Sequence, residues 1–285
     1  MPELPEVETM AADLRGELIG RVIKRVRISR KHLSYPAEVT GFAAAVSNTA
    51  IEAIRRRGKR LIFDLRDADA AARAILVEVR MTGEFHLLPA LARPHKHDRM
   101  ALALDDGREL RLRDPRGFCR IGAFDRDTDG HLRDATGLDP LRRMGPEPLL
   151  VPASTLAGRL SGRRGAIKPL LLDQSVIAGI GNIYADEALW RAGVHPTARA
   201  NSLSQTQLVA ITQSVQNVLA EAVERRGSSV RTYRSMGERG SMQDHLAAYG
   251  RAGQPCRACG TAMSALRVGG RGTTICERCQ PVPKV

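Results

Sequence analysis

Near its start the chain carries Pro2-Glu3-Leu4-Pro5-Glu6-Val7-Glu8-Thr9, which leads into a helix. From Leu4 to about Ile19 apolar residues recur at helical spacing, namely Val7, Met10, Ala11, Leu14 and Leu18. Gly16 and Gly20 mark the end of this pattern. The pattern predicts one amphipathic helix with an apolar face turned to a core.

The first two residues of this stretch can carry chemistry. Removal of Met1 would leave Pro2 as a free secondary amine, with a pKa near that of an α-amino group, about 8. Such an amine is substantially unprotonated at neutral pH and can attack a sugar carbon to form an iminium, while Glu3 moves a proton. In most proteins, however, Pro2 would be only a small residue and Glu3 an acid favoured by the helix dipole.

After this helix the chain shows short runs of alternating apolar residues, separated by turn signals such as Asp105-Asp106-Gly107. The runs are Lys24 to Ile28, Leu61/Phe63/Leu65, Ile75/Val77/Val79, Met100/Leu102/Leu104 and Leu110/Leu112. They predict an antiparallel β domain, either a sandwich or a barrel.

A proline-rich stretch from Asp139 to Pro152 predicts a linker, because proline removes backbone donors and fixes φ. Helical character follows over about residues 151 to 230. There Ser204-Gln205-Thr206-Gln207 matches a capping box, and Gly227 stops the helix that the box opens. The residues from 227 to 253 are rich in Gly, Ser and Arg and predict a loop with at most a short helix.

Charge and hydropathy narrow the class of protein. The 285 residues include 44 Lys and Arg against 31 Asp and Glu, a formal net charge of +13. This surplus favours a nucleic-acid partner, although an ordinary alkaline protein explains charge alone equally well. No apolar run approaches the roughly 18 residues of a membrane span and no secretion signal is visible, so we expect a cytosolic protein with no membrane partner.

Four of the five cysteines form two C-x2-C pairs, Cys256/Cys259 and Cys276/Cys279, with sixteen residues between the pairs. Two such knuckles can place four thiolates around one ion, so the spacing predicts one structural Zn2+ with no open coordination position. A redox pair or a chance spacing is the alternative. The finger also carries cations that fit either DNA contact or a solvated surface: Arg257, Arg267, Arg271 and Arg278.

Three further segments each have two interpretations. Gly179-Ile180-Gly181-Asn182 precedes a helical run and can bring backbone N–H groups to a phosphate, or form a glycine turn with an asparagine cap. The basic run from Arg55 to Arg60 is either a solvated face or a phosphate contact. Asp114-Pro115-Arg116-Gly117-Phe118 predicts a turn that presents a cation and an aromatic ring to a base stack, unless Phe118 is buried.

Together these motifs resemble the formamidopyrimidine-DNA glycosylase family, and the resemblance covers nearly the whole chain. The matching segments occur in the family's order: residues 1 to 9, Arg56-Arg57-Gly58-Lys59, Met81-Thr82-Gly83, Lys96-His97-Asp98, Asp114-Pro115-Arg116, Ile167-Lys168-Pro169, Gly179 to Glu187, Tyr249-Gly250-Arg251 and the cysteine finger. The resemblance implies an α+β multi-domain fold. A β-sandwich with the catalytic helix (1–135) precedes a linker (136–152), a helix-two-turn-helix DNA-binding domain (153–245) and the zinc finger (246–285).

The resemblance also implies a bifunctional DNA glycosylase and abasic-site lyase of base excision repair. Pro2 would displace the damaged base and form a Schiff base, Glu3 would act as acid and base, and Lys59 would assist β-elimination. Arg271 would hold the phosphate and assist δ-elimination. The partner would be double-stranded DNA with a damaged base or abasic site in a cleft between the two main domains, and the protein a monomer at the nucleoid in the bacterial cytoplasm.

Further side chains would hold the DNA. Met81, Arg116 and Phe118 would fill the void left by the everted base, which offsets part of an unstacking cost on the order of a few kcal/mol. Contacts to DNA, mostly to phosphates, would come from five residues: His97, Arg116, Arg164, Lys168 and Asn182.

The chain departs from the family pattern at four places. Glu78 stands three residues before Met81, where the family usually has a histidine, and puts an anion near an expected phosphate. Gly117 replaces a second arginine, and Cys119 is unusual, although a lone cysteine is most often buried and inert. The segment from Arg231 to Leu246 lacks the usual Gly-Tyr-Phe loop, which in relatives covers the base pocket.

These departures leave the substrate open. Oxidised purines, namely 8-oxoguanine and formamidopyrimidines, are the first expectation, and oxidised pyrimidines or another lesion the second. A non-catalytic zinc-finger protein that binds damaged DNA is an alternative from a different class, and an RNA-binding translation factor fits the charge and zinc but not the N-terminus. The presence of Pro2, Glu3 and Lys59 together favours the enzyme.

Overall fold

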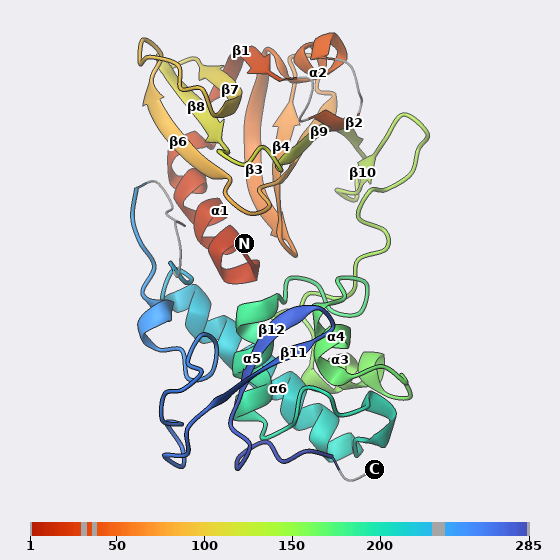
Figure 1. Ribbon diagram of the computed structural model, residues 1–285. Coiled ribbons are helices and arrows are strands. Elements are labelled where there is room, and N and C mark those ends of the chain that lie inside the picture. The colour runs from red at the N-terminus through yellow and green to blue at the C-terminus, as the bar shows by residue number, and fades with distance from the viewer. Residues whose placement is uncertain (1, 30–32, 36–38, 230–236, 284–285) are drawn as a thin grey trace. The chain divides into compact units, whose positions relative to one another are not determined.

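The structure is a computed structural model that describes residues 2–29, 33–35, 39–229 and 237–283, with only the backbone of 33–35. The chain divides into two compact units (Figure 1). Unit 1 contains Met1–Pro2, Glu6–Arg143 and Ser228–Gly240, and unit 2 contains Glu3–Pro5, Met144–Gly227 and Ser241–Val285. The domain limits given by the resemblance stay a prediction.

Unit 1 is built on one ten-stranded sheet, in the order β10-β9-β5-β4-β3-β1-β7-β8-β6, with β2 parallel to β9. The strands are β1 (Val22–Ile28), β2 (Leu33–Tyr35), β3 (Thr49–Arg57), β4 (Arg60–Arg66), β5 (Ala72–Glu78), β6 (Glu84–Pro89), β7 (Asp98–Leu104), β8 (Arg108–Arg113), β9 (Arg120–Arg126) and β10 (Leu132–Arg133). The pairings along this order are antiparallel. One cluster of buried side chains draws members from both ends of the order, so the sheet closes over a common core as a sandwich.

The predicted amphipathic helix is α1 (Leu4–Leu18), and its apolar face enters this core through Val7, Met10 and Leu14. A second helix, α2 (Val39–Val46), adds Phe42 and Val46 to the same cluster. The sequence did not predict α2 or strands β2, β3, β6, β9 and β10. Strands such as β5 and β9 are covered on both faces, because a second small cluster packs on the other side, and their buried runs therefore lack alternation.

Unit 2 is helical up to the finger and has its own core. Its helices are α3 (Ala153–Leu160), α4 (Ile167–Leu172), α5 (Asn182–Arg191) and α6 (Gln205–Glu224), with two short 3-10 turns, η2 (Ala200–Ser202) and η3 (Met242–Asp244). The capping box is confirmed, because the Ser204 hydroxyl accepts from the Gln207 N–H while the Gln207 side chain accepts from the Ser204 N–H. Apolar residues of α6 fill the core along one face, as the sequence predicts.

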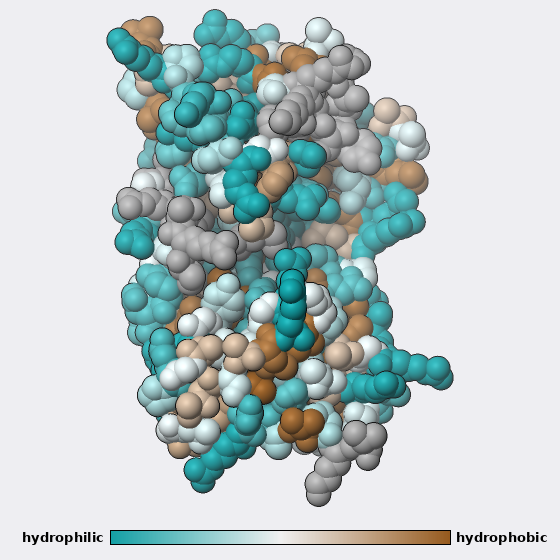
Figure 2. Space-filling model, in the orientation of Figure 1, coloured by the Kyte–Doolittle hydropathy of each residue, from teal (hydrophilic) through white to brown (hydrophobic). Residues whose placement is uncertain are grey.

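The C-terminal part of unit 2 is a two-stranded antiparallel hairpin, β11 (Ser264–Val268) and β12 (Arg271–Ile275). Its turn uses Gly269 and Gly270, both with positive φ. Across the described residues, no helix combines the length and hydropathy that crossing a bilayer requires. In Figure 2 hydrophilic residues cover much of the visible face of unit 1, with hydrophobic residues only in small groups.

Candidate active site and zinc centre

The Glu3 carboxylate lies at the N-terminus of α5. Its Oε1 accepts a hydrogen bond from the backbone N–H of Ile183 at 3.0 Å, and the side chain is 3% exposed. Gly181 is the N-cap of α5, and a Cβ at this position would overlap the Glu3 carboxyl group. The glycine segment, interpreted from the sequence as either a phosphate site or a capped turn, receives a carboxylate of the chain itself, which the positive end of the helix dipole stabilises.

A second glycine of this segment fixes the residue that follows Glu3. The backbone N–H of Leu4 donates to the carbonyl of Gly179 at 3.0 Å, and Gly179 has a φ of +88°. A Cβ on Gly179 would come within 2.7 Å of the Leu4 Cδ1 atom. Both glycines thus serve close approach of residues 3 and 4, and Asn182 is not the helix cap, because α5 begins at Asn182 and its N-cap is Gly181.

Asn182 and Lys168 meet on the backbone of β12. The Asn182 Nδ2 group donates to the carbonyl of Gly272 at 2.9 Å, and the Lys168 Nζ group donates to the same carbonyl at 3.1 Å. Arg271 is exposed and immediately precedes Gly272 at the start of β12. Unit 2 therefore holds the predicted residues Glu3, Lys168, Asn182 and Arg271 together.

Lys168, a predicted phosphate contact, has partners within the protein. Its side chain is fully buried, and its ammonium pairs with Asp186 at 2.6 Å and donates to the Thr273 hydroxyl at 2.6 Å. Burial lowers the pKa of Lys168 and raises the pKa of Asp186 to about 6, although each group favours the charge of the other. This ammonium has internal partners and fixes β12 against α5 instead of facing solvent.

The four cysteines of the two pairs converge. The ligand atoms of Cys256, Cys259, Cys276 and Cys279 all lie within 4.8 Å of one another, with Sγ–Sγ distances of 3.9 Å for Cys256–Cys279 and 3.4 Å for Cys259–Cys276. Tetrahedral Zn–S bonds of about 2.3 Å place sulfur atoms about 3.8 Å apart, so the four thiolates fit one zinc ion. The Trp190 indole N–H donates to Cys256 Sγ at 3.4 Å and connects the zinc centre to α5.

Glu187 is a structural residue of this unit that the sequence analysis did not single out. Its fully buried carboxylate accepts from the backbone N–H groups of Ala247, Ala248 and Tyr249 at 2.8 to 2.9 Å. Three such donors hold the chain where it enters the finger. The available signal in the sequence was the position of Glu187 within the segment from Gly179 to Glu187, which matches the family.

Lys59 lies at the tip of a hairpin in unit 1. Arg57 and Arg60 pair across β3 and β4, so Gly58 and Lys59 form a two-residue turn, and Gly58 has a φ of +57°. The basic run before it is internally paired, because Arg55 Nε contacts Asp64 at 2.5 Å and Arg56 Nε contacts Glu8 at 2.8 Å. Arg55 and Arg56 therefore have partners within the protein, Lys59 lies in the turn, and a phosphate contact of the run stays a prediction.

The predicted wedge residues Met81, Arg116 and Phe118 lie on two turns that Asp114 joins. The Asp114 carboxylate accepts from the Thr82 hydroxyl, beside Met81, and from the backbone N–H groups of Arg116 at 3.2 Å and Cys119 at 2.8 Å. Burial opposes ionisation of Asp114, but these hydrogen bonds outweigh it and hold the pKa of the carboxyl below its usual value.

Phe118 is not buried. Its side chain is 47% exposed, and the Arg116 guanidinium lies over its ring at 4.8 Å from the centroid. The turn therefore presents a cation and an aromatic ring together, as the sequence predicts. Cys119 is buried beside them, and burial raises the pKa of its thiol to about 12, which makes it unreactive.

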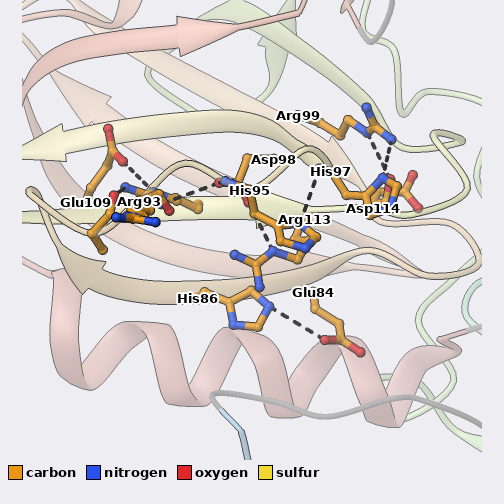
Figure 3. A network of polar contacts seen from close by, with 12 residues as sticks. Glu84, His86, Arg93, His95, His97, Asp98, Arg99, Glu109, Arg113 and Asp114 are labelled. Carbon is orange, nitrogen blue, oxygen red and sulfur yellow. Dashed lines mark hydrogen bonds and ion pairs between the residues drawn. The ribbon is translucent and has the colours of Figure 1, made fainter.

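His97 lies among cations of the sheet's polar network (Figure 3). Its Nδ1 atom is 3.3 Å from Arg99 Nη2, and its backbone carbonyl accepts from the Asp114 N–H at 2.9 Å. Partial burial and then the charges of Lys96 and Arg99 lower the pKa of His97. A phosphate beside this imidazole would neutralise the surrounding charge, so the location fits the predicted contact.

The remaining predicted residues are placed as follows. Pro2 is buried and directly precedes Glu3, and Arg164 is exposed in the loop between α3 and α4. Glu78 pairs with Arg60 at 2.7 Å and also with Arg80. The divergent segment from 231 to 246 lies partly outside the described residues, and within its described part Met242 is buried in the core of unit 2.

Glu6 is a buried acid that the sequence analysis missed. Its Oε1 accepts from the backbone N–H of Ser228 at 2.7 Å, within unit 1. Glu6 belongs to the opening stretch of the chain, so its place in that motif was the available signal. The contact fixes the start of the segment that continues into the divergent residues.

Three family models match the chain. They are the formamidopyrimidine-DNA glycosylase N-terminal domain over residues 1–121, the formamidopyrimidine-DNA glycosylase H2TH domain over 144–234, and a zinc finger found in FPG and IleRS over 253–282. A formamidopyrimidine-DNA glycosylase of Chloroflexus aggregans is 44% identical over 293 residues, which span 98% of each protein.

Solved structures agree over the full length. Lactococcus lactis Fpg in complex with abasic-site DNA aligns with a TM-score of 0.86 and 30% identity, covering 98% of this chain and 100% of that chain. MutM in complex with DNA containing carbocyclic 8-oxo-G aligns with a TM-score of 0.86 and 31% identity, covering 99% of this chain and 100% of that chain.

A β-sandwich, a helix-two-turn-helix domain and a four-cysteine zinc finger define a DNA-repair glycosylase. The chain belongs to the formamidopyrimidine-DNA glycosylase family. The predicted family, fold class and zinc ion are thereby confirmed, and the translation-factor alternative is wrong, because the matches cover the catalytic and H2TH domains as well as the finger.

Proposed function

We propose that this enzyme excises oxidised purines, 8-oxoguanine and formamidopyrimidines, from double-stranded DNA and then cleaves the abasic site. The observation that carries the proposal is the Glu3 carboxylate, fixed at the N-terminus of α5 one residue after Pro2. A nucleophile and an acid-base group on adjacent residues suit imine chemistry at a sugar carbon. Relatives solved with abasic-site and 8-oxo-G DNA support the choice of substrate.

The proposed first step belongs to Pro2 and Glu3. With Met1 removed, the Pro2 nitrogen attacks C1′ of the everted nucleotide while the bond to the base breaks. The nitrogen loses its proton and an iminium forms between Pro2 and the opened sugar, with Glu3 transferring protons between ring oxygen, base and water. The Ile183 N–H holds one carboxylate oxygen of Glu3, so its direction is set before DNA binds.

Strand cleavage follows from the iminium. Loss of a C2′ proton expels the 3′ phosphate by β-elimination, assisted by Lys59 on its hairpin turn, and a second elimination expels the 5′ phosphate. Arg271 is proposed to hold the departing phosphate, and the shared contact of Asn182 and Lys168 with Gly272 would position it. Zinc is structural in this scheme, since four thiolates complete its coordination.

DNA would be held by His97, Arg116, Arg164 and Asn182, with Met81, Arg116 and Phe118 filling the base stack. Lys168 would act through β12 because its ammonium is buried. We propose that the protein works as a monomer in the bacterial cytoplasm, with the domain limits that the family resemblance implies. Oxidised pyrimidines are the second candidate substrate, since the segment from Arg231 to Leu246 departs from the family's pocket-covering loop.

Borohydride trapping tests the proposal. Duplexes carrying 8-oxoguanine, a ring-opened purine, 5-hydroxyuracil or an abasic site are incubated with the protein, with Pro2→Gly as control. Reduction should freeze the iminium as a covalent adduct, faster on the two purine lesions than on 5-hydroxyuracil, and Pro2→Gly should form much less adduct on the duplexes that carry a damaged base. Tight binding without an adduct on any lesion would show a damage-binding protein, and a faster adduct on 5-hydroxyuracil would show a pyrimidine enzyme.

A further inference from the structure

Unit 1 contains a basic groove outside the residues proposed above. Its volume is about 800 Å3, and residues of β4, β5 and β9, which neighbour one another in the sheet, line it. Five arginines line it: Arg60, Arg80, Arg120, Arg142 and Arg143. We name this the arginine groove.

The acids of the groove are engaged by the protein itself. Three line it, Glu78, Asp134 and Asp139, so five guanidinium groups leave a surplus of two positive charges. Glu78 pairs with both Arg60 and Arg80. Asp134 and Asp139 accept hydrogen bonds from the backbone of the turns that contain them.

The cations at the far end of the groove are available. Arg142 and Arg143 are exposed, and within the described part of the chain neither guanidinium makes a hydrogen bond or ion pair, while the charge of Arg142 acts on Asp134 through space. A solvated guanidinium is a bidentate donor for phosphate oxygens. The groove can therefore accept an anion without first breaking contacts of these two side chains.

The near end of the groove adjoins the wedge turns. Arg80 directly precedes Met81, and Arg120 follows Phe118 by two residues. Arg80 has a φ of +56°, a left-handed conformation that favours glycine and costs an L residue about 1 kcal/mol or more. An arginine in this conformation, held by Glu78, keeps a cation beside the wedge at a position where glycine would be less strained.

We propose that the arginine groove binds the sugar-phosphate backbone of the DNA next to the base step that Met81 and Phe118 fill. The proposal rests on the proposed function for the wedge. Continuity with the wedge favours DNA over an acidic peptide. It also gives Glu78 a role, because this carboxylate orients Arg60 and Arg80 and does not face a phosphate as an unpaired anion. Cations around the groove thus replace the phosphate contacts that Glu78 and Gly117 do not make.

The dependence of DNA affinity on salt tests the groove. Each phosphate contact contributes about 0.9 to the slope of log K against log salt, so Arg142→Gln/Arg143→Gln should lower the slope by about 1.8 and weaken binding. The matched control is Lys24→Gln/Arg25→Gln, which removes two exposed cations of β1 outside the groove and should leave the slope unchanged. Thermal unfolding of both variants checks that the fold is intact.

Fluorescence anisotropy supplies the readout, on an undamaged duplex and on a duplex with a stable abasic analogue. The two proposals can be tested separately, because DNA binding does not require turnover. If the unmodified enzyme formed no borohydride adduct, the proposed function would be overturned, but the salt slopes of the variants could still be compared. An unchanged slope, or an equal loss in the β1 control, overturns the groove as a DNA site. If Arg142→Gln/Arg143→Gln lost binding to a labelled oligoglutamate peptide but kept the salt slope of DNA binding, the groove would be a site for an acidic protein partner and not for DNA.

Discussion

Glu3 and Gly181 are in such close contact that no side chain fits between them, because a Cβ at position 181 would overlap the Glu3 carboxyl group. The two residues are far apart in sequence, and the carboxylate uses the free N–H of Ile183 as its anchor. The first turn of α5 is thus part of the proposed acid-base machinery. This relationship explains why the segment before α5 carries glycine at 181 although its φ of −131° suits any residue.

Gly181→Ala should displace Glu3 and lower the rate of base excision by about 100-fold, since a shift of about 1 Å in a reacting group has effects of that order. Single-turnover excision of 8-oxoguanine measures it. Gly158→Ala in α3 is the control, because a Cβ there meets nothing within 4 Å, and it should keep full activity and gain about 0.5–1 kcal/mol of stability. Equal rates for the two variants would contradict the role given to this contact.

Asp186→Asn should destabilise the protein by about 3–5 kcal/mol, because it leaves the Lys168 ammonium buried without a counter-charge. Urea unfolding with saturating zinc measures the free energy. The double variant Lys168→Met/Asp186→Leu should recover most of the loss, since no charge remains buried. Arg191→Ala, which removes a partly exposed pair between Arg191 of α5 and Glu221 of α6, should cost less than about 1 kcal/mol. A loss in the double variant as large as in Asp186→Asn would refute this account.

Asp114→Asn should destabilise the wedge turns in a pH-dependent way. The folded-state pKa of Asp114 lies below the unfolded value of about 3.9, so its contribution is present above pH 4 and is lost as pH falls through the folded value. The difference in melting temperature between the wild type and Asp114→Asn should therefore be largest near pH 7 and shrink toward pH 2. A difference that stays constant over this range would show that the carboxylate charge has no part in holding the turns.

Removal of zinc should be visible through Trp190, the only tryptophan of the chain, because its indole N–H contacts Cys256. Chelation should shift its fluorescence to longer wavelength, release one zinc per chain and abolish DNA binding. Cys276→Ser should bind no zinc, whereas Cys119→Ser, which changes a buried cysteine outside the cluster, should keep one. Unchanged affinity and salt slope after verified metal loss would remove the finger from the DNA-binding surface.

Local sequence signals predicted the elements whose pattern is self-contained. The amphipathic face of α1 and the Ser204 capping box depend on residues that are close together in the sequence. The spacing of the two cysteine pairs depends on the tetrahedral coordination of one zinc ion. Strand β9 escaped prediction because both of its faces are covered, which only the closed sheet makes possible. The pairing of Arg55 and Arg56 could not be seen in the sequence, since their partners Asp64 and Glu8 come from other elements.

The sequence by itself indicated the family, through motifs in the family's order, and the zinc ligands, through the spacing of the two C-x2-C pairs. The proposed roles of Pro2 and Glu3 follow from that resemblance. Tertiary structure decided what the remaining groups contact. It placed Lys168 in a buried pair with Asp186, brought the glycines before α5 against Glu3 and Leu4, and gathered five arginines around one groove. The physical reason is that burial and pairing of a charge depend on neighbours distant in sequence, whose approach only the packed fold fixes.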